Sequence, residues 1–306
     1  MSYAIGIDIG GTNIKAVCVK PSGEVFMETS ITTDDEPDAG WPNRIKQQVE
    51  HIQSIQSTRH GDADWIGVAS PGLAAPDGST ITWMQGRMEA VQGLNWTALF
   101  NFHRPVPVLN DAHAALLGEV WLGAAAGSRN AALFTLGTGV GGAVLVDGHL
   151  LKGHIGRAGH LGHICLDVDA APDIVNTPGS LEDAIGECSI NTRGRGVYTS
   201  TRALVDAHNT GDEEASSVWL RSIWQLACGI VSVVNVTDPE CVIIGGGIAK
   251  ASDNLFGPLR KFVDRIEWRP TGSGVRIVPA ELGEFAGALG AARNAMAADQ
   301  ESNVSN

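Results

Sequence analysis

The stretch DIGGTNIK at residues 8–15 joins two apolar segments and sets the fold that this sequence predicts. Residues 3–9 form an apolar run that predicts a buried strand, and residues 13–20 alternate in polarity as a returning strand does. Glycine lets a backbone approach a phosphate closely, and the hydroxyl and amide of Thr12 can both donate to it. The stretch predicts a phosphate-binding hairpin, with a glycine turn that binds nothing as the alternative.

A second copy of the pattern begins near residue 130. Residues 130–136 predict a strand, Gly137-Thr138-Gly139 a turn, and residues 141–147 a returning strand. DIGGTNIKAV in the first copy corresponds to TLGTGVGGAV in the second. The duplication predicts an α/β protein of two lobes with a ligand between them, and the second loop favours phosphate binding over an empty turn.

A third glycine loop, Gly245-Gly246-Gly247, lies between a strand at 240–244 and a helix near 253–266. Its N–H groups could face a nucleotide, or the loop could be a simple strand-to-helix turn. The first loop does not match the Walker pattern GxxxxGK[ST], and the first two loops lack the setting of a dinucleotide fingerprint. The loops therefore predict a nucleotide site of another kind.

Asn110-Asp111 follows a short strand at 106–109 and opens a helix at 112–123. Asp111 is either the N-cap of this helix or a base that accepts a proton from a hydroxyl group. The other elements that the periodicity predicts are strands at 24–31, 64–69 and 275–279, helices at 41–58, 215–236 and 284–297, and an irregular segment at 151–196.

The bulk composition disfavours other classes of protein. The chain has 306 residues, 43% of them hydrophobic and 18% charged, which suits a folded protein of one large α/β domain or two lobes. The net charge of −13 and the lack of a Lys/Arg cluster disfavour a nucleic-acid partner. The five cysteines form no CxxC pair, which favours free thiols in a reducing compartment. Because we find no signal-peptide pattern and no uncharged apolar stretch of about 18 residues, we expect a cytoplasmic protein without membrane contact.

Six segments together resemble the ROK family, which contains sugar kinases and repressors, from Ile5 to about Ala292. In the family's order they are DIGGTNIK (8–15), LNDAHAALLGE (109–119), GTGVGGAVLVDG (137–148), GHLGHICLD (159–167), GSLED (179–183) and DPECVIIGGGI (238–248). The resemblance implies an α/β protein with an actin-like (ribonuclease H-like) fold of two lobes, in which sugar and ATP meet. It implies a small N-terminal lobe at 1–112, completed by the helix at 284–297, and a large lobe at 113–283.

The resemblance implies an enzyme that transfers the γ-phosphate of ATP to a hexose hydroxyl, usually the one on C6, with Mg²⁺ as cofactor. Glucose is the expected sugar. Another hexose, an N-acetylhexosamine, a polyphosphate donor and a non-catalytic sugar-binding protein remain open. The repressors of the family carry a helix-turn-helix before the kinase-like part, and the first phosphate loop at residue 8 leads us to expect none. We expect a homodimer, as is common in the family.

The resemblance also implies roles for individual residues. Asp111 would deprotonate the sugar hydroxyl. Independently of the resemblance, the carboxylate of Asp8 beside the first glycine loop could hold Mg²⁺, directly or through water. The residues that would bind the sugar are Asn110, His160, His163 and Glu182. Those that would bind the nucleotide are Asp8, Gly10, Gly11, Thr12, Lys15, Thr138, Gly139, Gly246 and Gly247.

The chain departs from the family's zinc motif, which is a His followed by CxCGxxGC. His163 is present, but Asp173, Val175 and Ser180 stand where the family has cysteines. Because zinc in structural sites prefers four thiolate and imidazole ligands, we expect no structural zinc. Prolines and packing would then hold the loop at 165–180.

His160 is a second departure, because the family has a Glu at this position of its ExGH segment. A neutral imidazole donates one hydrogen bond and accepts one, whereas a carboxylate only accepts. Sugar recognition near C1 and C2 would therefore change, unless His160 is only a spacer. Arg87, in a segment that does not match the family, is either a substrate contact or an exposed arginine. His113 replaces an Asn of the family and is predicted to be a packing residue of its helix.

Overall fold

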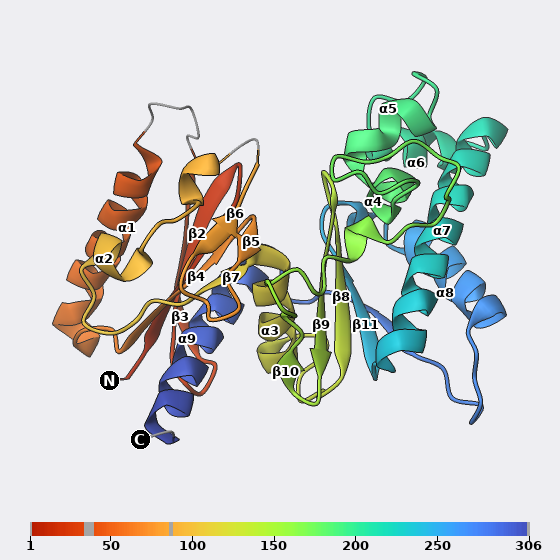
Figure 1. Cartoon of the computed structure of the whole chain (residues 1–306). Coiled ribbons are helices and arrows are strands. Elements are labelled where there is room, and N and C mark those ends of the chain that lie inside the picture. The colour runs from red at the N-terminus through yellow and green to blue at the C-terminus, as the bar shows by residue number, and fades with distance from the viewer. Residues whose placement is uncertain (1, 34–39, 86–87, 305–306) are drawn as a thin grey trace. The chain divides into compact units, whose positions relative to one another are not determined.

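The computed structural model describes residues 2–33, 40–85 and 88–304, which form two compact units, each built on a five-stranded sheet (Figure 1). Unit 1 contains residues 1–127, 152–158 and 281–306, and unit 2 contains residues 128–151 and 159–280. The sequence places the boundary between the lobes after residue 112, whereas the units divide after Gly127.

The sheet of unit 1 has the strand order β3-β2-β1-β4-β7. Its strands are β1 (Ala4–Ile9), β2 (Asn13–Val19), β3 (Val25–Thr32), β4 (Trp65–Ser70) and β7 (Val108–Asn110). The first three pair antiparallel, whereas β4 runs parallel to β1 and β7 runs parallel to β4. The structure confirms all five strands that the sequence predicts here.

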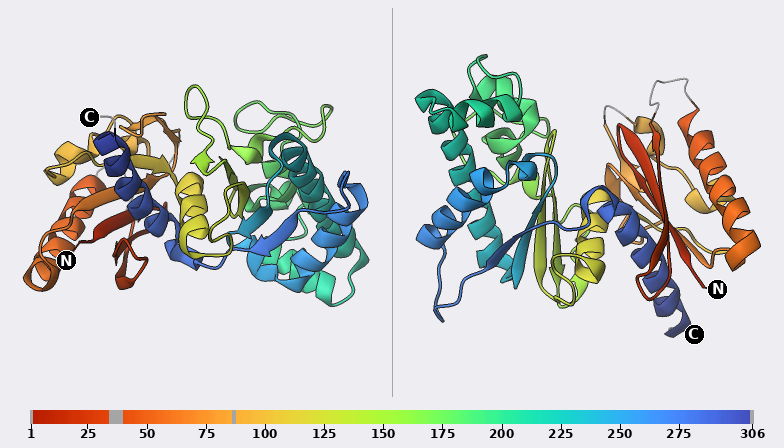
Figure 2. Two further views of the ribbon diagram at one scale, coloured as in Figure 1. Left: turned by 90° about the horizontal axis from the view of Figure 1, so that it is seen from below. Right: turned by 180° about the vertical axis from the view of Figure 1, so that it is seen from behind.

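Helices cover both faces of this sheet: α1 (Trp41–His60) lies on one face, and α9 (Ala286–Val304) lies on the other (Figure 2). Alternation along β1 decides which helix each side chain meets. Ile5 and Ile7 share a core cluster with Ile45 of α1, whereas Ala4 packs with Ala288 of α9. The buried strand predicted at 3–9 is thus apolar because both of its faces are covered.

Glycines let α9 approach its neighbours closely. A side-chain carbon on Gly6 of β1 would overlap the carbonyl of Ala288, and one on Gly290 would overlap the carbonyl of Ala114. Ala114 belongs to α3 (Asp111–Leu122), which packs along α9. Because of this packing α3 belongs to unit 1, and the division between the units falls after it.

The sheet of unit 2 repeats the topology of the first, with the order β10-β9-β8-β11-β12. Its strands are β8 (Ala131–Leu136), β9 (Val140–Val146), β10 (His149–Leu150), β11 (Cys241–Gly245) and β12 (Arg276–Pro279). Again the first three pair antiparallel, whereas β11 runs parallel to β8 and β12 runs parallel to β11. The internal duplication predicted from the two glycine loops is confirmed at the level of the whole sheet.

Two long helices build the core of unit 2, α7 (Glu213–Thr237) and α8 (Asp253–Ile266). Asp212 caps α7 by accepting a hydrogen bond from the Ala215 N–H. Trp219 of α7 and Phe134 of β8 are fully buried in the same cluster. By length and composition α7 could cross a membrane, but 56% of its most apolar window is buried inside the protein, as in a core helix.

The remaining elements are short, and the sequence did not predict them. They are β5 (Leu73–Ala74), β6 (Ile81–Trp83), α2 (Trp96–Phe100), α4 (Leu181–Ile185), α5 (Ile190–Arg193), α6 (Thr201–Asn209) and the 3₁₀ helices η1 (Glu89–Val91), η2 (Leu161–His163), η3 (Glu187–Ser189), η4 (Ile248–Ala251) and η5 (Gly283–Phe285). Several lie in the segment predicted as irregular, where no hydrophobic period marks them.

Candidate active site

In unit 1 the candidate residues gather where β1 and β7 end. The turn after β1 is closed by the Gly10 N–H, which donates to the Asn13 carbonyl at 3.0 Å. Thr33 holds the turn from the side: its hydroxyl donates to the Gly10 carbonyl at 2.6 Å, and its N–H donates to the Thr12 carbonyl at 2.8 Å. The Thr12 side chain stays exposed, so this turn can meet a ligand.

Two carboxylates of this unit, Asp8 and Asp111, lie close enough for their negative charges to repel each other. Burial, followed by the negative charge of Asp111, raises the pKa of Asp8 to about 7, while the Lys15 ammonium opposes the rise. Lys15 pairs with Asp8 across β1 and β2, and its Nζ lies 3.5 Å from Oε2 of Glu284. Burial and the charge of Asp111 thus disfavour the charged form of Asp8, although Lys15 partly compensates.

Asp111 is the first residue of α3, and it is not the N-cap. Asn110 caps the helix instead, because its Oδ1 accepts from the N–H groups of Ala112 and His113. The cap alternative for Asp111 is therefore wrong. Partial removal from water raises the pKa of Asp111, although hydrogen bonds from the Ala112 N–H and the Asn110 side chain oppose the rise. Its side chain keeps an exposed surface that a substrate can reach.

Asn110 and His113 both have structural partners. The Nδ2 of Asn110 donates to the Gly72 carbonyl at 3.1 Å, so both ends of this amide hold the backbone. His113 is 2% exposed, and its Nε2 lies 3.0 Å from the Ala158 carbonyl. His113 is thus confirmed as a packing residue. Arg87 lies outside the residues that the structure describes.

In unit 2 the second glycine loop is held by the segment that follows α4. The N–H groups of Glu187 and Cys188 donate to the carbonyls of Gly137 and Thr138 at 3.0 and 2.8 Å. Oε2 of Glu182 accepts from the Val140 N–H at 2.9 Å. Glu182, a sugar-binding candidate, therefore also holds the end of the second glycine loop. The exposed Thr138 side chain is left for a ligand.

A cavity of about 620 Å³ opens beside this loop, within unit 2. It is lined by Gly137, Thr138, Glu187, Thr201, Arg202, Val205, Asp206, Asn209, Gly247, Ile248, Lys250, Ala251 and Asn254. The candidates Thr138 and Gly247 are among them. Gly139 and Gly246 are outside this lining, since Gly139 lies against Glu182 and Gly246 against the backbone of Leu136.

Most of the side chains of this cavity come from α6 and η4, and no local pattern in the sequence predicts them. Both oxygens of Glu187 accept from the Thr201 N–H, which ties the start of α6 to the phosphate loop. The buried hydroxyl oxygen of Thr201 has no hydrogen-bond partner among the described residues. A buried polar atom without a partner is costly, so Thr201 is suited to meet a ligand group.

His160 is the N-cap residue of η2, and His163 is its last residue. Burial, and then the neighbouring His163, lower the pKa of His160. Nδ1 of His163 lies 2.8 Å from Oδ2 of Asp173. No group of three or more His, Cys, Asp or Glu side chains suited to a metal ion occurs in the part of the chain that the structure describes. The loop at 165–180 is organised around Asp173, and not only by prolines and packing as the sequence suggested.

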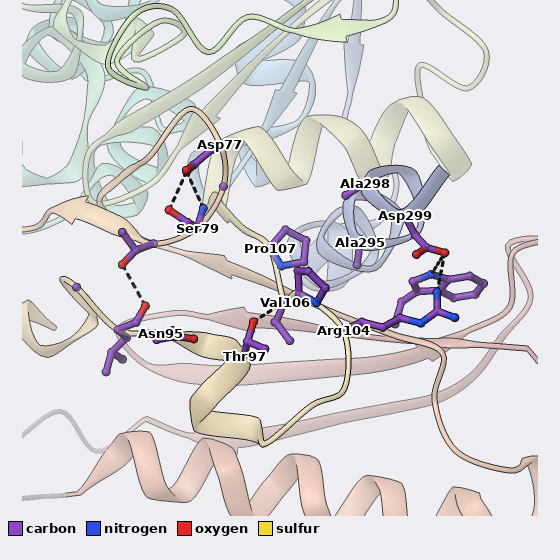
Figure 3. A pocket seen from close by; sticks show the side chains of 16 residues that line it. Asp77, Ser79, Asn95, Thr97, Arg104, Val106, Pro107, Ala295, Ala298 and Asp299 are labelled. Carbon is purple, nitrogen blue, oxygen red and sulfur yellow. Dashed lines mark hydrogen bonds and ion pairs between the residues drawn. The ribbon is translucent and has the colours of Figure 1, made fainter. Parts of the chain in front are cut away.

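A second cavity of about 550 Å³ lies on unit 1, and none of the candidate residues lines it (Figure 3). Asp299 accepts hydrogen bonds from Arg104 at 2.7 Å and from the Trp65 indole at 3.2 Å. Asp77 accepts from both the N–H and the hydroxyl of Ser79. Because these charged groups already have partners in the wall, they support the structure of unit 1 around this cavity.

Comparisons with known proteins show to which family the chain belongs. The model of the ROK family matches residues 4–298. The glucokinase of Thermotoga maritima is 31% identical over 307 residues, which cover 94% of this chain and 95% of the relative. The N-acetylmannosamine kinase of Vibrio cholerae is 27% identical over 298 residues, with coverages of 94% and 97%.

Two solved structures share the fold. The ROK hexokinase of Thermus thermophilus superposes with a TM-score of 0.83 at 26% identity, covering 98% of this chain and 99% of the other. The ROK glucokinase of Streptomyces griseus, in complex with glucose and AMPPNP, superposes with a TM-score of 0.76 at 25% identity, with coverages of 96% and 99%. The chain belongs to the ROK family. It has the actin-like fold of that family's sugar kinases, and it is an ATP phosphotransferase of this class.

Proposed function

We propose that the protein phosphorylates the C6 hydroxyl of a hexose with ATP, and that glucose is the expected substrate. The observation that carries the proposal is the pair of carboxylates Asp8 and Asp111 where β1 and β7 end, together with the turn after β1 that leaves Thr12 exposed; the pKa of both carboxylates is raised. Phosphoryl transfer needs a positioned base for the hydroxyl and a charged cradle for the phosphates, and this end of unit 1 offers both kinds of group.

Asp111 acts as the base in this proposal. Its carboxylate begins a helix and keeps an exposed surface, so a sugar hydroxyl can reach it. A pKa above the ordinary value brings a carboxylate closer to the working pH, which makes it a better proton acceptor. General-base catalysis of this kind contributes about 10²–10⁴-fold in rate.

Asp8 is the residue that would hold Mg²⁺. Its charged form is disfavoured by burial and by Asp111, and a divalent cation would relieve both effects. Mg²⁺ binds through one or two carboxylates together with phosphate oxygens, which fits this pair. When bound, the ion would neutralise charge on the phosphates. Lys15 supplies a further positive charge beside the same carboxylate.

The nucleotide occupies the cavity of unit 2 in this proposal. The exposed Thr138 lines this cavity, and so does Gly247, the N-cap residue of η4. Phosphates can approach a glycine backbone closely, because glycine has no side chain. We therefore assign nucleotide binding also to Gly10, Gly11, Gly139 and Gly246. The Streptomyces griseus relative was solved with AMPPNP, which supports ATP as the donor.

The residues proposed to bind the sugar are Asn110 of unit 1 and His160, His163 and Glu182 of unit 2. The relatives include a glucokinase and an N-acetylmannosamine kinase, so the alternative substrates are another hexose or an N-acetylhexosamine. His160 both donates and accepts when neutral, and the burial that lowers its pKa favours that neutral form. We expect the hydrogen bonds that His160 makes near C1 and C2 of the sugar to decide among these substrates.

The proposed activity is tested with purified protein, ATP–Mg²⁺ and a panel of glucose, mannose, fructose, allose, N-acetylglucosamine and N-acetylmannosamine. We expect sugar-dependent formation of ADP and a sugar 6-phosphate, with the highest kcat/KM for glucose. Omitting Mg²⁺ should abolish turnover, and light scattering checks the expected homodimer. If no sugar is phosphorylated although calorimetry detects sugar binding, the protein is a non-catalytic sugar binder and the proposal is wrong.

A further inference from the structure

The loop that follows η2 closes around one buried carboxylate, that of Asp173. Its side chain is 1% exposed. Oδ1 accepts hydrogen bonds from the N–H groups of Val175 at 2.9 Å and Thr177 at 2.8 Å. The Asp173 N–H donates in turn to the Thr177 carbonyl at 2.9 Å. A carboxylate so deeply buried and so fully hydrogen-bonded is a fixed point of the loop.

The other oxygen of Asp173 is turned toward His163. The distance from Oδ2 to Nδ1 of His163 is 2.8 Å. Burial alone would raise the pKa of Asp173, but hydrogen bonds from the Thr177 N–H, His163, the Val175 N–H and Ser180 outweigh it and lower the pKa. The group is therefore an ionised carboxylate, which only accepts hydrogen bonds. It follows that Nδ1 of His163 carries a hydrogen and donates it.

The backbone next to His163 is also fixed, at Gly162. Gly162 of η2 packs against the Val140 carbonyl of β9 so closely that a side-chain carbon would overlap it. The N–H of the same Val140 donates to Glu182. Thus η2 and Glu182 both contact Val140, the first residue of β9.

Ser180 connects Asp173 to the helix that carries Glu182. Its hydroxyl oxygen accepts from the Asp183 N–H at 3.2 Å and so caps α4. The Ser180 side chain also forms one of the hydrogen bonds to Asp173. Two of the four sugar-binding candidates, His163 and Glu182, are therefore positioned by one connected set of contacts.

We propose that Asp173 is a positioning residue of the sugar site: it orients the imidazole of His163 and keeps the hydrogen on Nδ1. In the neutral imidazole a hydrogen on Nδ1 leaves Nε2 as an acceptor, and Nε2 then receives a hydrogen bond from a sugar hydroxyl. His163 has 29% of its side chain exposed, which leaves this ring accessible. The inference rests on the proposed function in assigning the sugar to His163, but the orientation and the tautomer do not depend on it.

The tautomer is tested by ¹⁵N NMR on the full chain with labelled histidine and no sugar. The signals of His163 are identified among the nine histidines by their loss in His163→Gln. We expect an Nδ1-protonated ring in the wild type. We expect the Asp173→Asn variant to lose this fixed tautomer, because its amide cannot accept from all the present donors. An Nε2-protonated ring in the wild type, or an unchanged spectrum in the variant, would overturn the inference.

The positioning role is tested by kinetics with Asp173→Asn and, as a matched control, Asp169→Asn, an exposed carboxylate of the same loop. In Asp173→Asn the KM for the sugar should rise by about tenfold, which corresponds to the loss of roughly one hydrogen bond. The KM for ATP should change by less than about twofold. The control should change neither. Equal rises in both constants would indicate a merely structural role and contradict the inference.

A second variant covers the case in which Asp173→Asn does not fold. His163→Gln leaves the carboxylate and its backbone donors in place, and should raise KM for the sugar as much as the first variant is expected to. Unchanged sugar KM in His163→Gln contradicts the inference. If the wild type phosphorylates no sugar, the proposed function fails, and the NMR experiment still decides the role of Asp173.

Discussion

The carboxylate of Asp8 lies against Gly287, the second residue of α9. A side-chain carbon built on Gly287 would be 2.6 Å from Oδ2 of Asp8, closer than real contacts allow. Gly287 therefore leaves room for a carboxylate at the end of β1, in a strand whose other residues on this face are small. The position of Asp8 depends on this one missing side chain.

We predict that Gly287→Ala displaces Asp8 and lowers kcat/KM for the sugar kinase reaction by about 10–100-fold, the order expected for misplacing a group at the reacting centre. The matched control is Gly257→Ala in α8, where a side-chain carbon meets no atom within 4 Å. It should keep full activity and gain up to about 1 kcal/mol in stability. Equal activity of the two variants in a coupled ADP assay would count against this role of Gly287.

The raised pKa of Asp8 predicts how stability depends on pH. Its pKa of about 7 lies above the ordinary value, so between about pH 4 and 7 the folded protein binds more protons than the unfolded chain. Stability therefore falls as the pH rises through this window, by at most about 4 kcal/mol. Asp8→Asn removes the effect, and its melting temperature relative to the wild type should rise from about pH 4.5 to 7.5. A difference that stays constant over this range would refute the assignment.

Glu119 is predicted to be the largest single stabiliser of the segment at which the chain re-enters unit 1. It is fully buried, and its carboxylate accepts from the N–H groups of Ala124, Glu281 and Leu282 at 2.8–3.2 Å. Glu119→Ala should lower the free energy of unfolding by about 2–5 kcal/mol, since each buried N–H left without an acceptor costs about 1–3 kcal/mol.

The control for this prediction is Glu214→Ala. Glu214 pairs with Arg195 at 3.7 Å, and both side chains are largely exposed. Exposed ion pairs contribute about 0–1 kcal/mol, so this variant should unfold like the wild type in urea. If the urea midpoint of Glu119→Ala were as high as that of the control, the hydrogen bonds accepted by Glu119 would not be needed for stability.

The metal content provides a further prediction. Because Asp173 and its hydrogen bonds organise the loop at 165–180, we expect metal analysis of the purified protein to find no stoichiometric zinc. Dialysis against a zinc chelator should leave the melting temperature unchanged. One zinc ion per chain, or a large loss of stability after dialysis, would contradict this expectation.

The sequence predicts the strands and glycine turns well because both leave local signals. The period of two at 13–20, the apolar runs and the glycine pairs depend only on neighbouring residues. The duplicated sheets of the two units follow from those signals. Asp111 remained ambiguous, because a helix cap and a base use the same residue type, and only the structure shows that Asn110 is the cap.

The contacts that the sequence could not predict are those made across long stretches of chain. Thr201 and Asn254 line one cavity from separate elements, and no local pattern relates them. Glu119 binds Glu281 and Leu282, more than 160 residues away. Asp173 has the residue type of a surface loop, and its burial follows only from the way the loop folds back on it. Tertiary packing decides each of these cases.

The measurement that tests the central claim most directly compares Asp111→Asn with the wild type in phosphoryl transfer and in sugar binding. The substitution keeps the shape of the side chain and removes its ability to accept a proton. We predict that kcat falls by about 10²–10⁴-fold, while the sugar Kd from calorimetry changes by less than about threefold. A variant that retains wild-type turnover would show that Asp111 is not the base.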